Sequence, residues 1–212
     1  MSEQQEHVAG QQAFAHDDVE LVEAKVLQDG FFRLEQREFR HQRFNGGWSD
    51  VIHREVHVHH DAVGVLPYDP VNDRVVFVEQ IRAGMLEDAR TPWSLEPIAG
   101  LVDKDEQAHE VARREAIEEA GCELTDLIEL YRYYPSPGAC TEEVTLFIGL
   151  CDSSGLGGVH GLAEENEDIR VHVLDFQAAL TLLEQGRLGN AMAIMAMQWL
   201  LRERASLRVM HA

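Results

Sequence analysis

The sequence is poor in basic residues. It has 18 Lys and Arg against 38 Asp and Glu, which gives a formal net charge of −20 at pH 7. Such a surplus of negative charge repels polyanions, so it argues against a general nucleic-acid surface or an anionic-membrane surface. An anionic substrate would have to bind where local metal ions and arginines overcome this repulsion.

Cysteines and long apolar runs are also scarce. The three cysteines, Cys122, Cys140 and Cys151, lie in or beside apolar stretches, which is typical of reduced core residues in a cytoplasmic protein. Residues 1–18 are polar and acidic without the apolar run of a signal peptide, and no segment is long and apolar enough to span a bilayer. We therefore expect a cytoplasmic protein with no membrane or nucleic-acid partner.

The sequence is rich in carboxylates at one place, residues 107–120. This stretch has no Gly or Pro, and its alanines recur every fourth residue from Ala108 to Ala120, which predicts a helix with one narrow apolar ridge. On that helix Glu115, Glu118 and Glu119 are neighbours at i,i+3 and i,i+4, and each like-charge pair costs about 0.2–0.5 kcal/mol. A hard cation would remove this cost. Oxygen ligands without His or Cys favour Mg²⁺ over Zn²⁺, with Mn²⁺ as the other possibility.

The alternative is a solvated helix face, which is ordinary for glutamates in an acidic chain. Three nearby features favour the metal site. Gly100 suits a sharp turn or a close approach of the backbone to a ligand, and Glu106 falls where the helix begins. Arg114 lies four residues from both Glu110 and Glu118.

The full pattern from Gly100 to Cys122 resembles the signature of the Nudix hydrolase family. Its specified positions are Gly100, Glu106, Arg114, Glu115, Ala116, Glu118, Glu119, Gly121 and Cys122. The resemblance implies a metal-dependent hydrolase of diphosphates with an α/β fold, in which helices on both sides of a mixed sheet form an α/β/α sandwich. We expect this core in residues 59–212, preceded by a small antiparallel β-sheet domain in residues 1–58.

Hydrophobic patterning and turn residues predict the order of the elements. Predicted strands occupy residues 19–27, 31–44, 49–58, 62–66, 74–80, 127–134 and 143–150, and helices occupy residues 175–184 and 190–203. Residues 152–168, rich in Gly and then in carboxylates, are expected to be a loop. That loop is either a mobile, solvated connection or the source of a general base that closes on substrate. The small N-terminal sheet buries too little apolar surface to be stable alone, so we expect it to pack on another element or on a second subunit.

Further motifs resemble the ADP-ribose pyrophosphatase branch of the family, especially its bacterial members. They are Asp29-Gly30-Phe31-Phe32, Val78-Glu79-Gln80-Ile81-Arg82, Ser136-Pro137-Gly138 and Glu165-Asn166-Glu167-Asp168-Ile169. This likeness implies cleavage of ADP-ribose to AMP and ribose 5-phosphate by a homodimer with two or three Mg²⁺ ions. Another nucleoside diphosphate sugar such as GDP-mannose is the alternative substrate, and a Nudix-like binding module without turnover is the alternative from a different class.

The resemblance also implies roles for individual residues. The metal set would be the Ala99 carbonyl, Glu115, Glu119 and Glu167, with Glu165 as the general base. Glu118 could share a metal, and Arg114 with Glu106 would be an orienting ion pair. The substrate contacts would be Phe31, Phe32, Arg54, Glu55, Arg82, Leu101, Ser136 and Glu142.

Each of these assignments has a plainer alternative. Phe31 and Phe32 are adjacent in a predicted strand, so one of them could simply face a core. Arg54 and Arg82 could be surface arginines, although a chain this acidic has few cations to place on a diphosphate. The histidines at positions 53, 57, 59 and 60 follow strand alternation and are read as surface residues and not as metal ligands.

Overall fold

The computed structural model describes residues 12–102, 106–162 and 166–211. The chain divides into two units. The first contains the described residues up to His59 together with Ser136–Thr141, and the second contains His60–Pro135 and the described residues from Glu142 onward. The sequence suggested a contiguous division after residue 58, whereas Ser136–Thr141 belong to the first unit although they come from the middle of the chain.

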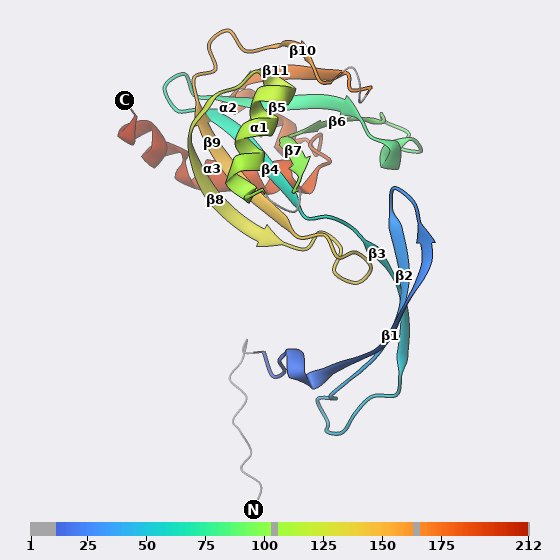
Figure 1. Ribbon diagram of the computed structural model, residues 1–212. Helices are drawn as coiled ribbons and strands as arrows, with labels where there is room; N and C mark the ends of the chain where they lie inside the picture. The colour runs from blue at the N-terminus through green and yellow to red at the C-terminus, as the bar shows by residue number, and fades with distance from the viewer. Residues whose placement is uncertain (1–11, 103–105, 163–165, 212) are drawn as a thin grey trace, which may run out of the picture. The chain divides into compact units, whose positions relative to one another are not determined.

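The first unit is built on a three-stranded antiparallel sheet in the order β1-β2-β3 (Figure 1). A short 3₁₀ turn, His16–Asp18, precedes β1 (Val19–Asp29), β2 (Arg33–His41) and β3 (Ile52–Val58). The three predicted strands are present with shifted bounds, since the second ends at His41 and not at residue 44 and the third begins at Ile52 and not at residue 49. The second strand begins at Arg33 and not at residue 31, because Asp29 pairs with Arg33 and the residues between them form the turn. All of β1 is exposed, in agreement with the small apolar core expected for this sheet.

The second unit is built on an eight-stranded mixed sheet in the order β10-β11-β5-β4-β9-β8, with β6 paired to β5 and β7 paired to β4. Strands β4 and β9 run parallel, and the other pairs are antiparallel. The strands are β4 (Ala62–Asp69), β5 (Arg74–Ile81), β6 (Trp93–Glu96), β7 (Ile98–Leu101), β8 (Leu124–Tyr133), β9 (Val144–Cys151), β10 (Gly158–His160) and β11 (Ile169–Asp175).

The sequence predicted β4, β5, β8 and β9 but missed the other four strands of this sheet. Strands β6 and β7 have four residues each and are separated by Pro97, so neither is long enough to show a period. Strand β10 lies inside residues 152–168, so the expectation of a loop throughout that stretch is wrong at Gly158–His160. A short 3₁₀ turn, Ala83–Met85, was missed as well.

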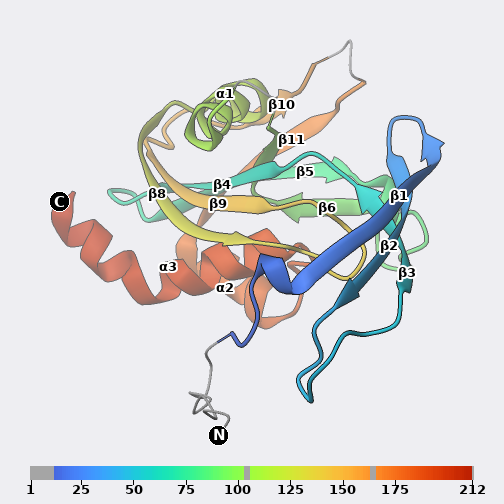
Figure 2. The same cartoon turned by 60° about the horizontal axis from the view of Figure 1, so that its bottom comes forward.

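Helices cover both faces of this sheet (Figure 2). Helix α1 (Ala108–Ala120) packs on one face with the buried side chains of Val63, Val76 and Ile98, while α2 (Phe176–Glu184) and α3 (Ala191–Met210) pack on the other. The α/β/α sandwich with a mixed sheet is therefore confirmed. Helix α3 continues to Met210, beyond the predicted end at residue 203. None of the described helices combines the length and the apolar character needed to cross a membrane.

Both ends of α1 are fixed by local hydrogen bonds. At its start the Gln107 N–H donates to the Glu110 carboxylate at 2.9 Å, as in a capping box. At its end Gly121 adopts a left-handed conformation with φ 59°, and the Cys122 N–H donates to the Ala116 carbonyl at 2.9 Å. Three of the four alanines of the predicted ridge, Ala112, Ala116 and Ala120, are buried, so the helix lies close to the sheet.

Candidate active site

Helix α1 and strand β7 bring together the central residues of the predicted metal site. The Glu119 side chain is almost fully buried at 4% exposure, and its Oε2 accepts a hydrogen bond of 3.3 Å from the Ala99 N–H. One turn earlier on the helix, the Glu115 carboxylate lies directly against Gly100. The two carboxylates therefore face the same strand.

Gly100 corrects one expectation. It lies in β7, paired with Val63 of β4, and it does not have the left-handed φ of a sharp turn. A Cβ at this position would collide with the Glu115 carboxylate. The predicted close approach to the backbone is real, but the group that approaches is the side chain of Glu115.

Arg114 connects three carboxylates beside this pair. Its Nη1 donates to Glu115 Oε1 at 2.8 Å and to Glu118 Oε2 at 2.9 Å, and its Nε donates to Glu106 Oε1 at 3.2 Å. Glu110, the other partner suggested by spacing, instead accepts from the helix N-cap. Hydrogen bonding to Glu106 is the main factor that raises the pKa of Arg114, so the guanidinium stays charged.

Burial makes the two inner carboxylates resist ionisation. Burial, followed by the negative charge of Glu115, raises the pKa of Glu119 to about 8, against the opposing effects of the Ala99 N–H and Arg82. Burial also raises the pKa of Glu115, although Arg114 opposes the shift. Glu167 contributes to both increases through its negative charge, which places that charge near the pair. The site has more negative charge than its own hydrogen-bond donors compensate.

The ligand atoms available at this site are of the type that a hard divalent cation prefers. Glu115, Glu119 and Glu167 offer only oxygen, and a cation would supply the positive charge that the raised pKa of Glu119 shows to be lacking. Among the described residues, no three Asp, Glu, His or Cys side chains converge in a metal-holding arrangement. The Glu167 carboxylate accepts instead from the Leu162 N–H at 3.1 Å. The expected general base, Glu165, lies outside the described residues.

Arg82 lies where β5 ends, in the same unit as the carboxylates. It pairs with Glu96 of β6, and its Nε donates to Glu96 Oε1 at 2.7 Å. Glu96 is only 2% exposed, and its Oε2 accepts from Asn190 Nδ2 at 3.1 Å. Sequence reasoning missed both Glu96 and Asn190. No signal in the sequence could have found them, because β6 has four residues and buries its polar Ser94 and Glu96 while the apolar Trp93 is exposed.

Several predicted substrate contacts belong to the first unit. Phe31 and Phe32 lie in the turn between β1 and β2 and not within a strand, so the argument that one of them must face a core does not apply. Phe31 is 89% exposed, whereas the Phe32 ring packs edge-on against His57 with centroids 4.7 Å apart. His57 is half-buried, which corrects its reading as a surface histidine.

The remaining predicted contacts are divided between the units. Arg54 and Glu55 are exposed on β3, and Ser136 is exposed in the segment Ser136–Thr141. Leu101 ends β7 in the second unit, where it pairs with Ala62. Glu142, also in the second unit, is half-buried and adds to the increase that burial causes in the pKa of Tyr133.

A cavity of about 570 Å³ lies elsewhere in the second unit. Its apolar walls include Leu95, Leu174 and Leu182, which pack on the α2 and α3 side of the sheet. None of the predicted site residues lines it. The candidate site is therefore the carboxylate group on the α1 side and not this hollow.

Comparison with known proteins agrees with this geometry. The NUDIX domain model matches residues 58–194, a span that contains α1, β7 and Arg82. The chain belongs to the NUDIX family. Within the family it is 42% identical over 187 residues to an ADP-ribose pyrophosphatase of Escherichia coli, which covers 88% of this chain and 90% of the relative. It is also 42% identical over 192 residues to the ADP-ribose pyrophosphatase of Haemophilus influenzae, covering 89% of this chain and 88% of the relative.

Other relatives of this NUDIX protein carry a different substrate in their names. A GDP-mannose pyrophosphatase of Pectobacterium atrosepticum is 35% identical over 186 residues, covering 85% of this chain and 92% of the relative. A solved structure described as an ADP compounds hydrolase superposes with a TM-score of 0.65 at 18% identity, covering 90% of this chain and 97% of the other. At that identity the likeness supports the fold alone.

Proposed function

We propose that this NUDIX hydrolase cleaves the diphosphate of ADP-ribose to AMP and ribose 5-phosphate with Mg²⁺. The observation that carries the proposal is the 42% identity to ADP-ribose pyrophosphatases over about nine-tenths of both chains. The relatives named GDP-mannose pyrophosphatases match at 32–35%, which makes that sugar nucleotide the second candidate. The buried Glu119 and the half-buried Glu115 agree with catalysis and not with a binding-only module, because two adjacent ionisable acids are expensive to bury without a use for them.

We propose that the Ala99 carbonyl, Glu115, Glu119 and Glu167 hold two or three Mg²⁺ ions, which Mn²⁺ could replace. Bound metal would neutralise the diphosphate and lower the pKa of the attacking water. In this arrangement Arg114 keeps Glu115 and Glu118 in place, since it hydrogen-bonds both. Glu165 would remove the proton of the attacking water, as the resemblance implies.

We propose that the remaining predicted residues select the substrate. Arg82 would bind the diphosphate, for which a planar guanidinium is well suited. Phe31 is the better candidate for stacking on adenine, because Phe32 already packs on His57. Arg54 and Glu55 would complete the adenosine side, and Ser136 and Glu142 the side of the terminal ribose. Leu101 would be a further substrate contact.

We also propose a homodimer that works in the cytoplasm. The exposed β1 strand supports association, since Leu21 is 60% exposed and Val22 50%. The three free cysteines support a reducing compartment. Sedimentation analysis of the full chain tests the assembly, and a monomer at micromolar concentration would contradict it.

A substrate panel tests the reaction. The purified protein is incubated with Mg²⁺ and ADP-ribose, ADP-glucose, GDP-mannose or a dinucleotide in ¹⁸O-water, and the products are identified by mass. We expect the highest kcat/KM with ADP-ribose, AMP and ribose 5-phosphate as products, and no turnover with excess EDTA. The Glu115→Gln variant serves as the inactive control. Preferred release of GMP from GDP-mannose would favour the second candidate, and no turnover of any diphosphate would favour a binding module.

A further inference from the structure

Arg82 is paired with the carboxylate of Glu96, which is in turn hydrogen-bonded by Asn190. Glu96 is 2% exposed, and its two oxygens have different partners: Oε1 accepts from Arg82 Nε at 2.7 Å, and Oε2 accepts from Asn190 Nδ2 at 3.1 Å. A buried carboxylate is costly unless both its charge and its hydrogen-bonding capacity are satisfied. Here the charge is met by Arg82 and the second oxygen by Asn190, so the three side chains form one connected unit.

Asn190 has two roles that few side chains can combine. It is the N-cap of α3, and its Oδ1 accepts from the Ala193 N–H at 3.3 Å. Its Nδ2 donates to Glu96 at the same time. Asp or Ser would cap a helix as well, but neither can cap with an oxygen and also donate from a second terminal atom. Asparagine at this position therefore connects the beginning of α3 to Glu96.

We infer that Glu96 and Asn190 are positioning residues that fix the orientation of the Arg82 guanidinium for the substrate diphosphate. The inference rests on the proposed function, because a diphosphate is the group that Arg82 would meet. The Arg82 side chain is 43% exposed, and an arginine this exposed would otherwise sample many rotamers. Its attachment to Glu96 removes that freedom before substrate arrives, and a pre-oriented fork loses less entropy on binding.

The competing explanation is that Arg82 only neutralises the buried Glu96. A double-mutant cycle separates the two. We expect Glu96→Gln to lower kcat/KM about tenfold when Arg82 is present and less than about twofold in the Arg82→Ala background. Gln keeps the shape of the side chain and one acceptor oxygen. Asn190→Ser keeps a helix cap but removes the Nδ2 donor, and we expect the same dependence on Arg82.

A matched pair on the same sheet provides the control. Arg74 begins β5, at the end opposite to Arg82, and its Nε donates at 3.2 Å to Asp175, the last residue of β11. Arg74→Ala and Asp175→Asn should leave kcat/KM unchanged. Equal losses from Glu96→Gln with and without Arg82 would overturn the inference, because they would show that Glu96 acts on stability and not through Arg82.

A second measurement does not depend on turnover. In protein labelled with ¹⁵N-arginine, the Arg82 Nε–H signal is assigned by its disappearance in Arg82→Lys. We expect slow solvent exchange of this proton in the parent protein and exchange at least about tenfold faster in Glu96→Gln and Asn190→Ser, because the carboxylate that accepts it is changed or released. Unchanged exchange in both variants would overturn the inference. If the panel shows no turnover of any diphosphate, the proposed function fails while this exchange still decides how Arg82 is held.

Discussion

Two buried acidic clusters in the second unit have opposite properties. On the α1 side, Glu119 has one hydrogen-bond donor among the described residues, the Ala99 N–H, and burial raises its pKa to about 8. At the end of β4, where the turn to β5 begins, Asp69 is even more buried, at 1% exposure, yet its pKa lies at about 2. Both side chains are carboxylates in the second unit, Glu119 on helix α1 and Asp69 on strand β4. Burial alone therefore does not determine their charge.

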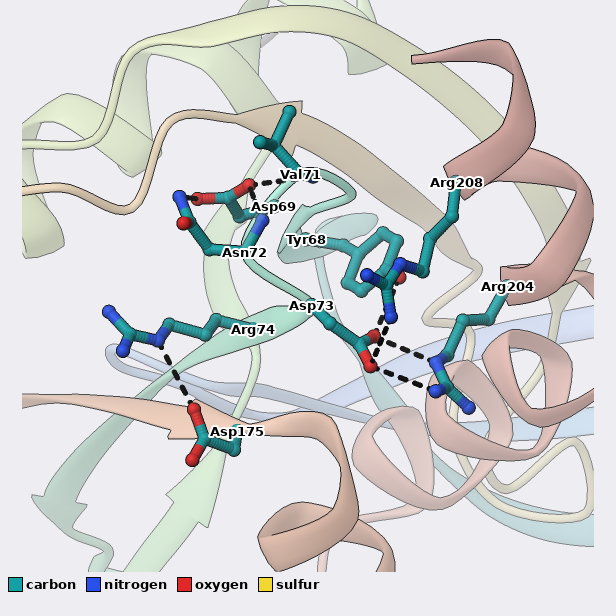
Figure 3. A network of polar contacts seen from close by, with 9 residues as sticks. All are labelled: Tyr68, Asp69, Val71, Asn72, Asp73, Arg74, Asp175, Arg204 and Arg208. Atoms are coloured by element: carbon teal, nitrogen blue, oxygen red, sulfur yellow. Dashed lines mark hydrogen bonds and ion pairs between the residues drawn. The ribbon is translucent and has the colours of Figure 1, made fainter. Parts of the chain in front are cut away.

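The difference lies in the number of donors. At Asp69, Figure 3 shows the hydrogen bonds from Val71 and Asn72. Burial by itself would raise the pKa of Asp69, but hydrogen bonds from Asn72 and Ser153 outweigh it. The Asn72 N–H donates at 2.9 Å and its Nδ2 at 2.8 Å, and Ser153 donates through its N–H at 2.9 Å and its hydroxyl at 2.7 Å.

Asp73 is satisfied in the same way, by charged donors from α3. Arg204 donates to both of its oxygens at 2.7 and 2.8 Å, Arg208 donates at 2.9 Å, and the Tyr68 hydroxyl donates at 2.9 Å. The cluster of Asp69 and Asp73 therefore has its charge and hydrogen-bonding capacity satisfied by the protein itself. It also anchors α3, which explains why this helix continues beyond its predicted end. The α1 cluster is incomplete, as a site for an external cation should be.

The largest expected effect comes from Glu119→Gln. We expect turnover to fall by at least about a hundredfold in saturating Mg²⁺, because one charged ligand is lost while the shape is kept. In EDTA at pH 8 the same change should raise the free energy of unfolding by about 2 kcal/mol. The raised pKa means that ionisation above about pH 4.5 disfavours the folded state, and this cost is complete above about pH 8. Steady-state kinetics and urea unfolding measure the two effects. Near-normal turnover would remove Glu119 from the metal site.

Asp73→Asn should have the opposite pattern, with a loss of stability and no loss of turnover. We expect the free energy of unfolding to fall by about 3 kcal/mol, because two arginines lose the charge that holds them. The kcat of the folded protein should not change. Asp88→Asn is the matched control, since Asp88 pairs with Arg90 at the surface and its loss should leave the unfolding midpoint where it is. A large loss of kcat in Asp73→Asn would show that the two clusters are coupled.

The pH dependence of stability should have opposite signs for the two clusters. Because the pKa of Asp69 is lowered on folding, its contribution is complete above about pH 4 and is lost as the pH falls through about 2, a change of about 2 kcal/mol. Urea unfolding in EDTA should therefore show a loss at low pH that disappears in Asp69→Asn. It should also show a loss between about pH 4.5 and 8 that disappears in Glu119→Gln. If one variant removed both the loss of stability at low pH and the loss between about pH 4.5 and 8, the two groups would not be independent.

The smallest expected effect is that of Gly100→Ala. The added Cβ meets the Glu115 side chain, which can rotate away, so stability should change little. Moving Glu115 out of the site should nevertheless lower kcat about tenfold. Gly138→Ala is the control, because nothing lies within 4 Å of a Cβ at that position. Loss of stability without loss of kcat would mean that Glu115 does not act from its observed position.

The local parts of this structure could be predicted from the sequence, and the non-local parts could not. Helix α1 follows from its own periodicity and caps, and its carboxylates follow from motif spacing. The ion pair of Arg82 with Glu96 and the bond from Glu96 to Asn190 join residues that are 14 and 94 positions apart. No pattern in one sequence reports such contacts. The sequence indicated that Gly100 allows a close approach to the backbone, but it does not show which group approaches. Strand β11 does alternate and could have been found.

The first unit includes a second, distant segment of the chain, Ser136–Thr141. In that segment the Ala139 carbonyl accepts from the His57 N–H at 2.8 Å, and the Thr141 N–H donates to the His57 carbonyl at 3.1 Å. A gene fragment that ends near His59 would encode β1, β2 and β3 without these partners. Recombination could therefore not transfer this unit between proteins as one continuous piece. We expect substitutions in the two segments to covary among homologues.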